Sequence, residues 1–572
     1  MICIVKSWLA QALEALKKNR RLLFLLGGIG TVILLVNAIA FWYMRTESTV
    51  YYWDISGYWT PAIELTELLH KGTLYQLINL LWESFQTDYN YSPLVLLLPI
   101  LKVAGVGRAA YVMSIINVYI IPAVLVGVYA FYLHHKEAFT ARMAVLGCLA
   151  LLLFPGLLLP ALHGQVDAIG LLIIGLIFVT LYKLDFLKFS YRYVLLAAEL
   201  CLLVVARRWY TYWAVTALAS AGILVFIKVL KEVQDNRKRL EAILRFCLNM
   251  AFTVGIILII MFVCFNYLFH AYTVDYSNLY SAYKNGGLWK QILNMVYYFG
   301  ALPITLMVIG YIMAYKSPVV RNKYVPTFFI LQSILIFVLF TSTQDFAAHH
   351  YYLLFPLFAF SFLSIILVSL SSRKVKQRIL LGSLFLVISA SFFSSFVIPG
   401  KSEWRHLLLG EINHPIVRED MGALRTMARD IETTREASEA VYVLASSDTL
   451  NDSIVRDINL PDRFLEGIAA TAHVDKRDGF PNQFFAANYV IVTNPAQTHL
   501  PQGQMVISVL ADAILKGECE NLILKKEYHL EDGVTAYLYQ RTAPYDETFI
   551  QQLRAKFEKA YKGNPALTSI HQ

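Results

Sequence analysis

Long apolar runs separated by short charged segments dominate the first 400 residues. The first run, residues 22–41, contains no charged residue and is about as long as the helix that crosses a bilayer. Further runs predict spans at residues 93–107, 109–133, 142–162, 168–184, 191–206, 209–227, 246–269, 293–315, 324–343, 350–370 and 379–398. We therefore expect residues 1–400 to form an all-α polytopic membrane domain of about 11–12 transmembrane helices.

Basic residues beside these runs predict the orientation of the chain. Lys17, Lys18, Arg20 and Arg21 precede the first span, and the positive-inside rule assigns them to the cytoplasm. The loop 43–92 is then outside, and we expect short interfacial helices in it. The same rule places further basic groups inside, namely Lys183, Lys188 and Arg192, the cluster 228–245, the group Lys316, Arg321 and Lys323, and the cluster 373–378.

The early spans contain a parity problem. Between the outer loop 43–92 and the inner Lys183 the chain must cross an odd number of times, although four of the runs above lie there. One of them is therefore expected to be a half-membrane or interfacial segment. The two candidates are 93–107, the shortest run, and 142–162, which is interrupted by Pro155 and Pro160.

The pattern changes after Pro399. Residues 401–572 mix polar and apolar positions, with short β-type runs at 441–445 and 489–493. Residues 511–516 predict a helix, and residues 527–540 predict a hairpin that turns at 531–533. We expect a soluble α/β domain on the extracytoplasmic side.

Composition agrees with a membrane protein and excludes a soluble enzyme, because 57% of the residues are hydrophobic and 14% are aromatic. The net charge of +9 comes from basic residues at helix ends, which favours contacts with membrane lipids and predicts no nucleic-acid partner. The six cysteines show no CxxC spacing, so neither a disulfide framework nor a zinc site is indicated.

Most of the unusual polar residues at the predicted membrane boundaries fall on the outer side, whereas Lys and Arg dominate the inner loops. Asp54 stands just after the first span, inside the aromatic segment 51–59. The same loop contains Asp88, and the later outer loops contribute His163, Gln165 and Asp167, then Arg207 and Arg208, and finally His349 and His350. Each alone is explained as well by a helix cap or a solvated loop tip. Ionisable groups near a bilayer usually face a cavity or one another, so their one-sidedness predicts a site.

Arg207 and Arg208 suit the phosphate of a lipid-linked donor, and no nucleotide-binding fingerprint competes with this interpretation. Guanidinium groups bind phosphate by bidentate, charge-assisted hydrogen bonds. Adjacent residues on a helix face about 100° apart. We therefore expect one arginine to point into the site while the other reaches the lipid headgroups.

Asp54 suits the acceptor side of the same reaction. A carboxylate at this place can take the proton of an acceptor hydroxyl as it attacks an anomeric carbon. Trp53, Tyr58 and Trp59 can stack on sugar rings. A histidine or a divalent metal can help to neutralise the leaving phosphate.

Several of these segments resemble the GT-C glycosyltransferases, polytopic enzymes that use polyprenyl-phosphate sugars. Asp54 matches the essential acid early in their first extracytoplasmic loop, and residues 90–94 (NYSPL) resemble a proline motif of protein O-mannosyltransferases and aminoarabinose transferases. Residues 163–167 (HGQVD) are similar to the Gly-Gln-x-Asp-type loop of GT-C mannosyltransferases, and residues 349–352 (HHYY) resemble a late His-Tyr motif. Ile55 stands where the protein-mannosyl branch has a second acid, so the resemblance leaves the metal open.

The resemblance covers roughly residues 20–400 and, with the residue chemistry above, predicts a role for each candidate. The predicted catalytic residues are Asp54 and Asp167. The donor phosphate is expected at Arg207, Arg208, His349, His350 and Tyr351. The sugar or acceptor is expected at Trp53, Tyr58, Trp59, Asp88, His163 and Gln165.

The predicted function is transfer of a sugar from a polyprenyl-phosphate donor to a glycan, lipid or protein in the cell envelope, at the outer face of a bacterial cell membrane. A polytopic transporter, or a flippase or polymerase of lipid-linked glycans, remains the alternative. Charges inside the predicted spans are scarce, Glu199 being an exception, and the loop 43–92 has no symmetric partner. Both features favour the transferase over a transporter.

Overall fold

The computed structural model describes residues 19–85, 89–264, 283, 286–436, 438–562, 564–568 and 570. Contacts divide the chain into two compact units. The helical unit comprises Met1–Arg45, Pro61–Val274 and Gly286–His414, and the C-terminal unit comprises Thr46–Thr60, Asp275–Asn285 and Pro415–Gln572. The C-terminal unit thus includes Thr46–Thr60, the first part of the predicted outer loop 43–92.

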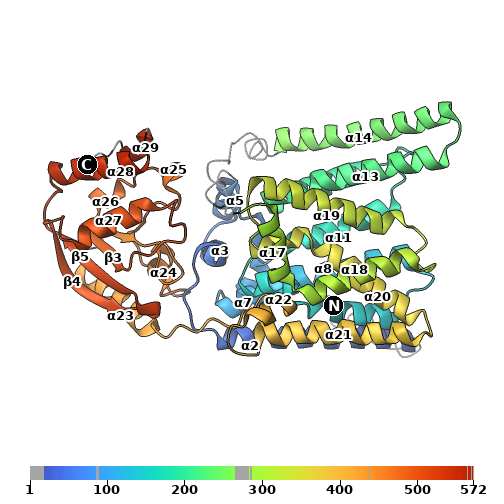
Figure 1. The fold of residues 1–572 in the computed structure, drawn as a ribbon, viewed down its shortest axis with the longest axis horizontal. Coiled ribbons are helices and arrows are strands. Elements are labelled where there is room, and N and C mark those ends of the chain that lie inside the picture. Colours follow the sequence, from blue (N-terminus) through green and yellow to red (C-terminus); the bar gives the residue numbers. More distant parts are fainter. Residues whose placement is uncertain are drawn as a thin grey trace. The chain divides into compact units, whose positions relative to one another are not determined.

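Long helices that lie side by side build the helical unit (Figure 1). Its longer elements are α2 (Arg20–Thr46), α5 (Leu74–Ser84), α7 (Arg108–Ile115) with η2 (Ile116–Ile120) and α8 (Ile121–His135), α9 (Ala141–Leu152), α10 (Pro155–Leu162), α11 (Ala168–Lys183), α12 (Arg192–Ala206), α13 (Thr211–Glu232), α14 (Asn236–Cys264), α17 (Leu288–Phe299), α18 (Ala301–Lys316), α19 (Tyr324–Thr343), α20 (Phe355–Leu370) and α21 (Val375–Phe396). The helix α4 (Trp59–Lys71) begins in the C-terminal unit and continues into this one.

Six helices among the described residues are long and apolar enough to cross a membrane, or eight if each of two bent pairs counts as one span. The chain is therefore an integral membrane protein with a polytopic helical part. Two more apolar helices of this unit, α11 and α20, are 16 residues long. The helix α20 begins at Phe355, five residues later than the run 350–370 predicts.

Helix length decides which early run is too short to cross. The run 93–107 forms η1 (Ser92–Leu94) and the seven-residue helix α6 (Leu98–Ala104). Seven helical residues rise about 10 Å, a third of the hydrocarbon thickness. The run 142–162 forms α9 and α10, two helices bent by 53°.

The prediction of one continuous span over residues 293–315 is wrong. Gly300 adopts φ +86° and divides this run into α17 and α18, which are bent by 95°. A Cβ atom at Gly300 would lie 2.5 Å from the carbonyl carbon of Leu409, so a side chain does not fit there. Glycine is the residue that permits both the positive φ and this close approach.

Two pairs of polar side chains connect neighbouring helices. Asn37 of α2 and Asn117 of η2 exchange hydrogen bonds of 3.1 and 2.6 Å between their side-chain amides. The Oγ1 of Thr180 in α11 donates to Glu199 of α12 at 2.9 Å. Such bonds are characteristic of helix contacts in membranes, where a polar group without a partner is costly to bury.

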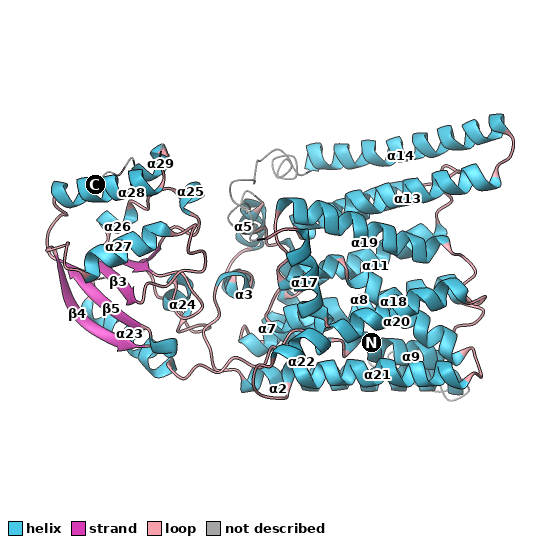
Figure 2. Cartoon of the chain, viewed as in Figure 1, coloured by secondary structure: helices cyan, strands magenta, loops and turns pink. Residues whose placement is uncertain are grey.

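A five-stranded mixed sheet forms the centre of the C-terminal unit (Figure 2). Its order is β2 (Ile468–Ala470), β1 (Val441–Leu444), β3 (Tyr489–Asn494), β5 (Thr535–Arg541), β4 (Leu522–His529). The strand β1 runs parallel to β2 and β3, whereas β5 is antiparallel to β3 and β4. The predicted strands at 441–445 and 489–493, the hairpin with its turn η5 (Glu531–Gly533), and the helix at 511–516, which is part of α27 (Met505–Leu515), are confirmed.

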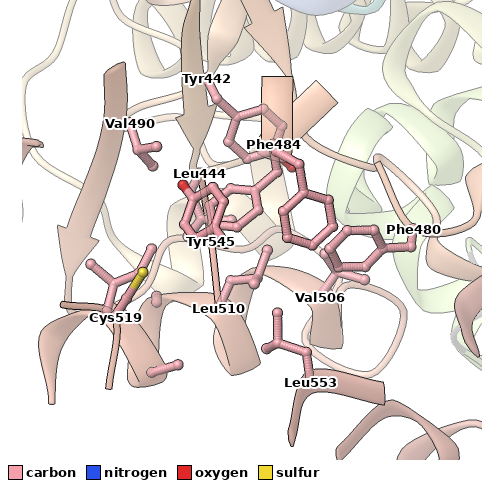
Figure 3. Packing of buried hydrophobic residues seen from close by; sticks show 14 of the residues in the cluster. Tyr442, Leu444, Phe480, Phe484, Val490, Val506, Leu510, Cys519, Tyr545 and Leu553 are labelled. Atoms are coloured by element: carbon pink, nitrogen blue, oxygen red, sulfur yellow. The ribbon is translucent and has the colours of Figure 1, made fainter. Parts of the chain in front are cut away.

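Both faces of this sheet are covered, as the continuous apolar runs of β1 and β3 require. On one face Tyr442, Leu444 and Val490 pack against α27 and α28 (Glu547–Ala560), as Figure 3 shows in part. The other face packs against α23 (Met421–Thr434) through Val443 and Ile491. The region is thus an α/β domain with helices on both sides.

The segment 46–60 is tied to the C-terminal unit by its backbone. Ser48 donates to the carbonyl of Ile416 at 2.9 Å and accepts from the amide of Arg418 at 2.8 Å. Val50 is buried in the core beside α23. The segment that carries Asp54 is therefore held by the C-terminal α/β domain.

Candidate functional site

A buried ion pair joins two loops at one end of the helical unit. Asp167 is the residue before α11, and Arg207 follows the end of α12. The Nε of Arg207 donates to Oδ1 of Asp167 at 2.6 Å, and their side chains are 10% and 3% exposed. The indole Nε1 of Trp209 donates to the same oxygen at 3.1 Å. Asp167 thus fixes the orientation of the guanidinium group.

The two arginines do not lie on one helix, so the expected 100° separation between them is wrong. Arg207 is extended (φ −157°, ψ 123°), and Arg208 begins the short η3 (Arg208–Tyr210). Tyr210 donates from its hydroxyl to the Asp167 carbonyl at 2.8 Å, which connects η3 to the start of α11. The two side chains differ in burial, because Arg207 is buried and Arg208 is half-buried. That one of them binds phosphate while the other reaches the headgroups stays a prediction.

His349 and His350 lie beside this ion pair. They belong to η4 (Ala348–Leu353), which precedes α20. The ring centroid of Trp209 lies 6.0 Å from that of His349 and 5.3 Å from that of His350. We refer to Asp167, Arg207, Trp209, His349 and His350 as the arginine–aspartate cluster.

His350 is neutral at physiological pH. Burial lowers its pKa well below the ordinary value, and His349 and the charges of Arg207 and Arg208 add to this effect. Its Nδ1 accepts a hydrogen bond from the amide of Ala347 at 3.0 Å. The proton of the neutral ring is therefore assigned to Nε2, which can donate to an oxygen atom.

The loop 163–167 is held by a buried arginine at the start of α7. Arg108 donates from Nη2 to the carbonyl of His163 at 2.7 Å, and Tyr111 donates to the carbonyl of Gly164 at 2.9 Å. Gly164 has φ +77°, and a Cβ there would lie 2.6 Å from Nη2 of Arg108. Burial and the charge of Arg108 lower the pKa of His163 to about 4. Gln165 is buried in the same loop.

Sequence reasoning missed Arg108, because the predicted span begins one residue after it. The sequence did offer a sign of its role, because Arg108 is a single charged residue between Gly107 and a long apolar run. Sequence reasoning also did not single out Trp209, whose indole N–H donates to Asp167.

The proline motif 90–94 and the residue before it lie beside Arg207 and the end of α12. Asn90 donates from its side-chain amide to the carbonyl of Val205 at 2.9 Å, at the end of α12. The guanidinium carbon of Arg207 lies 5.4 Å from the ring centroid of Tyr89. Asp88, a predicted sugar or acceptor ligand, lies outside the described residues.

Tyr351 is part of an aromatic stack. Its ring centroid lies 4.3 Å from that of Tyr298 in α17 and 5.0 Å from that of Phe346. Its buried hydroxyl has no hydrogen-bond partner among the described residues. Its role at the donor phosphate stays a prediction.

The candidate residues of the first loop belong to the C-terminal unit. Asp54 is half-buried in the first turn of α3 (Trp53–Ser56). Trp53 has φ +45°, a conformation rare for a bulky residue, and its ring centroid lies 4.6 Å from that of His499. Tyr58 and Trp59 are only 2% and 4% exposed. Sequence reasoning missed His499, which no motif marks.

The structure therefore brings Asp167, Arg207, His349 and His350 together in the helical unit, with Arg208 adjacent. It places Asp54, Trp53, Tyr58 and Trp59 in the C-terminal unit. In the described parts of the chain, no three His, Cys, Asp or Glu side chains lie close enough together to hold a metal ion.

No protein-family model matches this chain, and no curated protein matches its sequence.

Proposed function

We propose that this protein is a GT-C-type membrane glycosyltransferase that moves a sugar from a polyprenyl-phosphate donor to an extracytoplasmic glycan, lipid or protein. The observation that carries the proposal is the arginine–aspartate cluster at the ends of apolar helices. A buried guanidinium group held in one orientation suits a phosphate whose lipid tail lies among such helices.

The cluster supports phosphate binding because its residues have different roles: one orients the guanidinium group, and the others add positive charge and a hydrogen-bond donor. Asp167 accepts the hydrogen bond from Nε of Arg207 and acts as a positioning residue. Arg208 adds a second positive charge beside it, and the neutral His350 supplies a donor at Nε2. A phosphate that gains negative charge as it leaves is stabilised by such preorganised donors.

Asp54 is the proposed base. The acceptor oxygen attacks the anomeric carbon, and the bond between that carbon and the phosphate oxygen breaks. The acceptor proton passes to the Asp54 carboxylate, and the polyprenyl phosphate leaves with the bonding electron pair. Trp53, beside Asp54 in α3, is the proposed sugar-stacking residue.

The proposed location is a bacterial cell membrane, with the cluster on the extracytoplasmic side. The basic groups at the opposite helix ends, such as Lys183 at the end of α11 and Lys231 in α13, support this orientation by the positive-inside rule. A divalent metal in the reaction is tested by comparing turnover with and without a chelator.

The test incubates the purified full-length protein in detergent with labelled polyprenyl-phosphate sugars and a mixture of envelope glycans and lipids. Consumption of one donor, with release of polyprenyl phosphate and labelling of an acceptor, is expected. Arg207→Ala and Asp54→Asn should each lower it strongly. Movement of the donor across proteoliposomes without consumption would overturn the proposal in favour of a flippase.

A further inference from the structure

A separate cavity of about 410 Å³ lies inside the helical unit, between α8, α11, α13, α19 and α20. Its volume is typical of a site for a small organic ligand. Its walls include Val124, Phe131, Ile174, Phe178, Phe328 and Phe360. Apolar cavities of this kind do not hold ordered water well, so an apolar occupant is favoured.

One end of this cavity is polar. His134, Tyr182, Lys228 and Asn322 line it there. These residues come from the end of α8, the end of α11, the last turns of α13 and the residues just before α19. No acidic residue lines the cavity among the described residues, so the charge of its lining is positive.

The polar end lies at the helix ends opposite the arginine–aspartate cluster. The helix α11 begins just after Asp167 and ends at Lys183, and α13 begins just after η3, which follows Arg207, and ends at Glu232. The positive-inside rule assigns these far ends to the cytoplasmic side. The polar end of the cavity is therefore distinct from the proposed donor site.

The cavity has the length of one lipid leaflet. Its lining follows α8 from Ala123 to His135. Twelve steps along a helix rise about 18 Å, slightly more than the roughly 15 Å of hydrocarbon in one leaflet.

We propose that this cavity binds one anionic phospholipid of the cytoplasmic leaflet, with an acyl chain between α8 and α20 and the phosphate beside Lys228. Basic residues between transmembrane helices on the cytoplasmic side recognise such headgroups. Lys228 is 55% exposed and lies 3.9 Å from Glu232, a weak surface pair that a phosphate can replace.

Gly127 allows the acyl-chain part to be tested. It lines the cavity, and a Cβ there would have no atom within 4 Å. Gly127→Leu should therefore fill the cavity without a backbone clash. Gly382→Leu in α21 is the matched control, because Gly382 also has open space and does not line the cavity.

Native mass spectrometry of the full-length protein in detergent, titrated with phosphatidylglycerol or phosphatidylcholine, measures the binding. One phosphatidylglycerol should bind the wild type more tightly than phosphatidylcholine does. Gly127→Leu should weaken it about tenfold or more, the order expected when a buried apolar contact is lost, while Gly382→Leu leaves it unchanged. Equal binding by Gly127→Leu and the wild type would overturn the proposal.

Binding of the lipid phosphate by Lys228 is tested with substitutions of exposed residues, which should leave the folded structure intact. Lys228→Gln should weaken phosphatidylglycerol binding about fivefold, the order of one basic residue at an anionic lipid. Lys231→Gln on the same helix is the control, because Lys231 is exposed and does not line the cavity. Equal affinity of the wild type for both lipids, or equal effects of the two substitutions, would refute an anionic lipid.

Discussion

Replacing Arg207 by alanine should damage both the stability of the helical unit and its affinity for a phosphate. The carboxylate of Asp167, which is 3% exposed beside Arg207, would lose the Arg207 donor at 2.6 Å and keep the indole N–H of Trp209 at 3.1 Å. Removing one partner of a buried ion pair costs about 3–5 kcal/mol. A weakened enzyme would therefore not by itself prove a role in donor binding.

A double substitution separates the two effects. Arg207→Met with Asp167→Asn removes both charges, and replacing both partners of such a pair is often nearly neutral for stability. We expect the double variant to regain most of the stability that Arg207→Ala loses. It should still bind polyprenyl phosphate about 10- to 100-fold more weakly than the wild type, because a charge-assisted hydrogen bond contributes about 1.5–3 kcal/mol.

Thermal unfolding of the detergent-solubilised protein and titration with polyprenyl phosphate measure these two quantities. The conservative variant Arg207→Lys keeps the charge and loses the planar fork, so it should recover donor affinity only in part. If the double variant binds polyprenyl phosphate and turns over as well as the wild type, the pair is purely structural. That result would refute the phosphate role of Arg207.

Three further predictions concern other parts of the chain. Asp54→Asn should lower sugar transfer about 100-fold or more while polyprenyl-phosphate binding stays unchanged, and near-normal transfer would exclude Asp54 as the base. Burial raises the pKa of Asp475 to about 6. Between about pH 4 and pH 6 the carboxyl group therefore keeps its proton in the folded protein and loses it in the unfolded chain. The free energy of unfolding consequently falls as the pH rises from about 4 to 6. Asp475→Asn should then stabilise the protein by roughly 1–3 kcal/mol at pH 8 and have little effect below pH 4; equal effects in thermal unfolding at both pH values would contradict this. Gly164→Ala should destabilise the folded protein by about 2 kcal/mol, because Gly164 has a φ of +77° and lies close to Arg108. Gly107→Ala is the control, since Gly107 has a φ of −60° and open space around it. Equal melting temperatures of the two variants would refute backbone strain at Gly164.

Parts of the fold that depend on local pattern were predictable. The apolar runs are long enough for helices in a membrane, and the strands 441–445 and 489–493 are continuous apolar segments because the sheet is covered on both faces. The hairpin turn at 531–533 follows from Asp532 and Gly533, both with positive φ. The break at Gly300 was not predictable, because it depends on the approach of Leu409, over 100 residues away.

The apolar pattern of the chain is enough to identify a membrane protein with a C-terminal α/β region, because burial of apolar runs and backbone hydrogen bonding leave little choice. The sequence also marked Asp167, Arg207, His349 and His350, since charged and titratable residues are costly beside a bilayer. The folded chain was needed to show that Asp167 pairs with Arg207, that Arg108 supports their loop, and that Asp54 belongs to the C-terminal unit. These facts depend on contacts between residues far apart in the chain, and no local periodicity encodes such contacts.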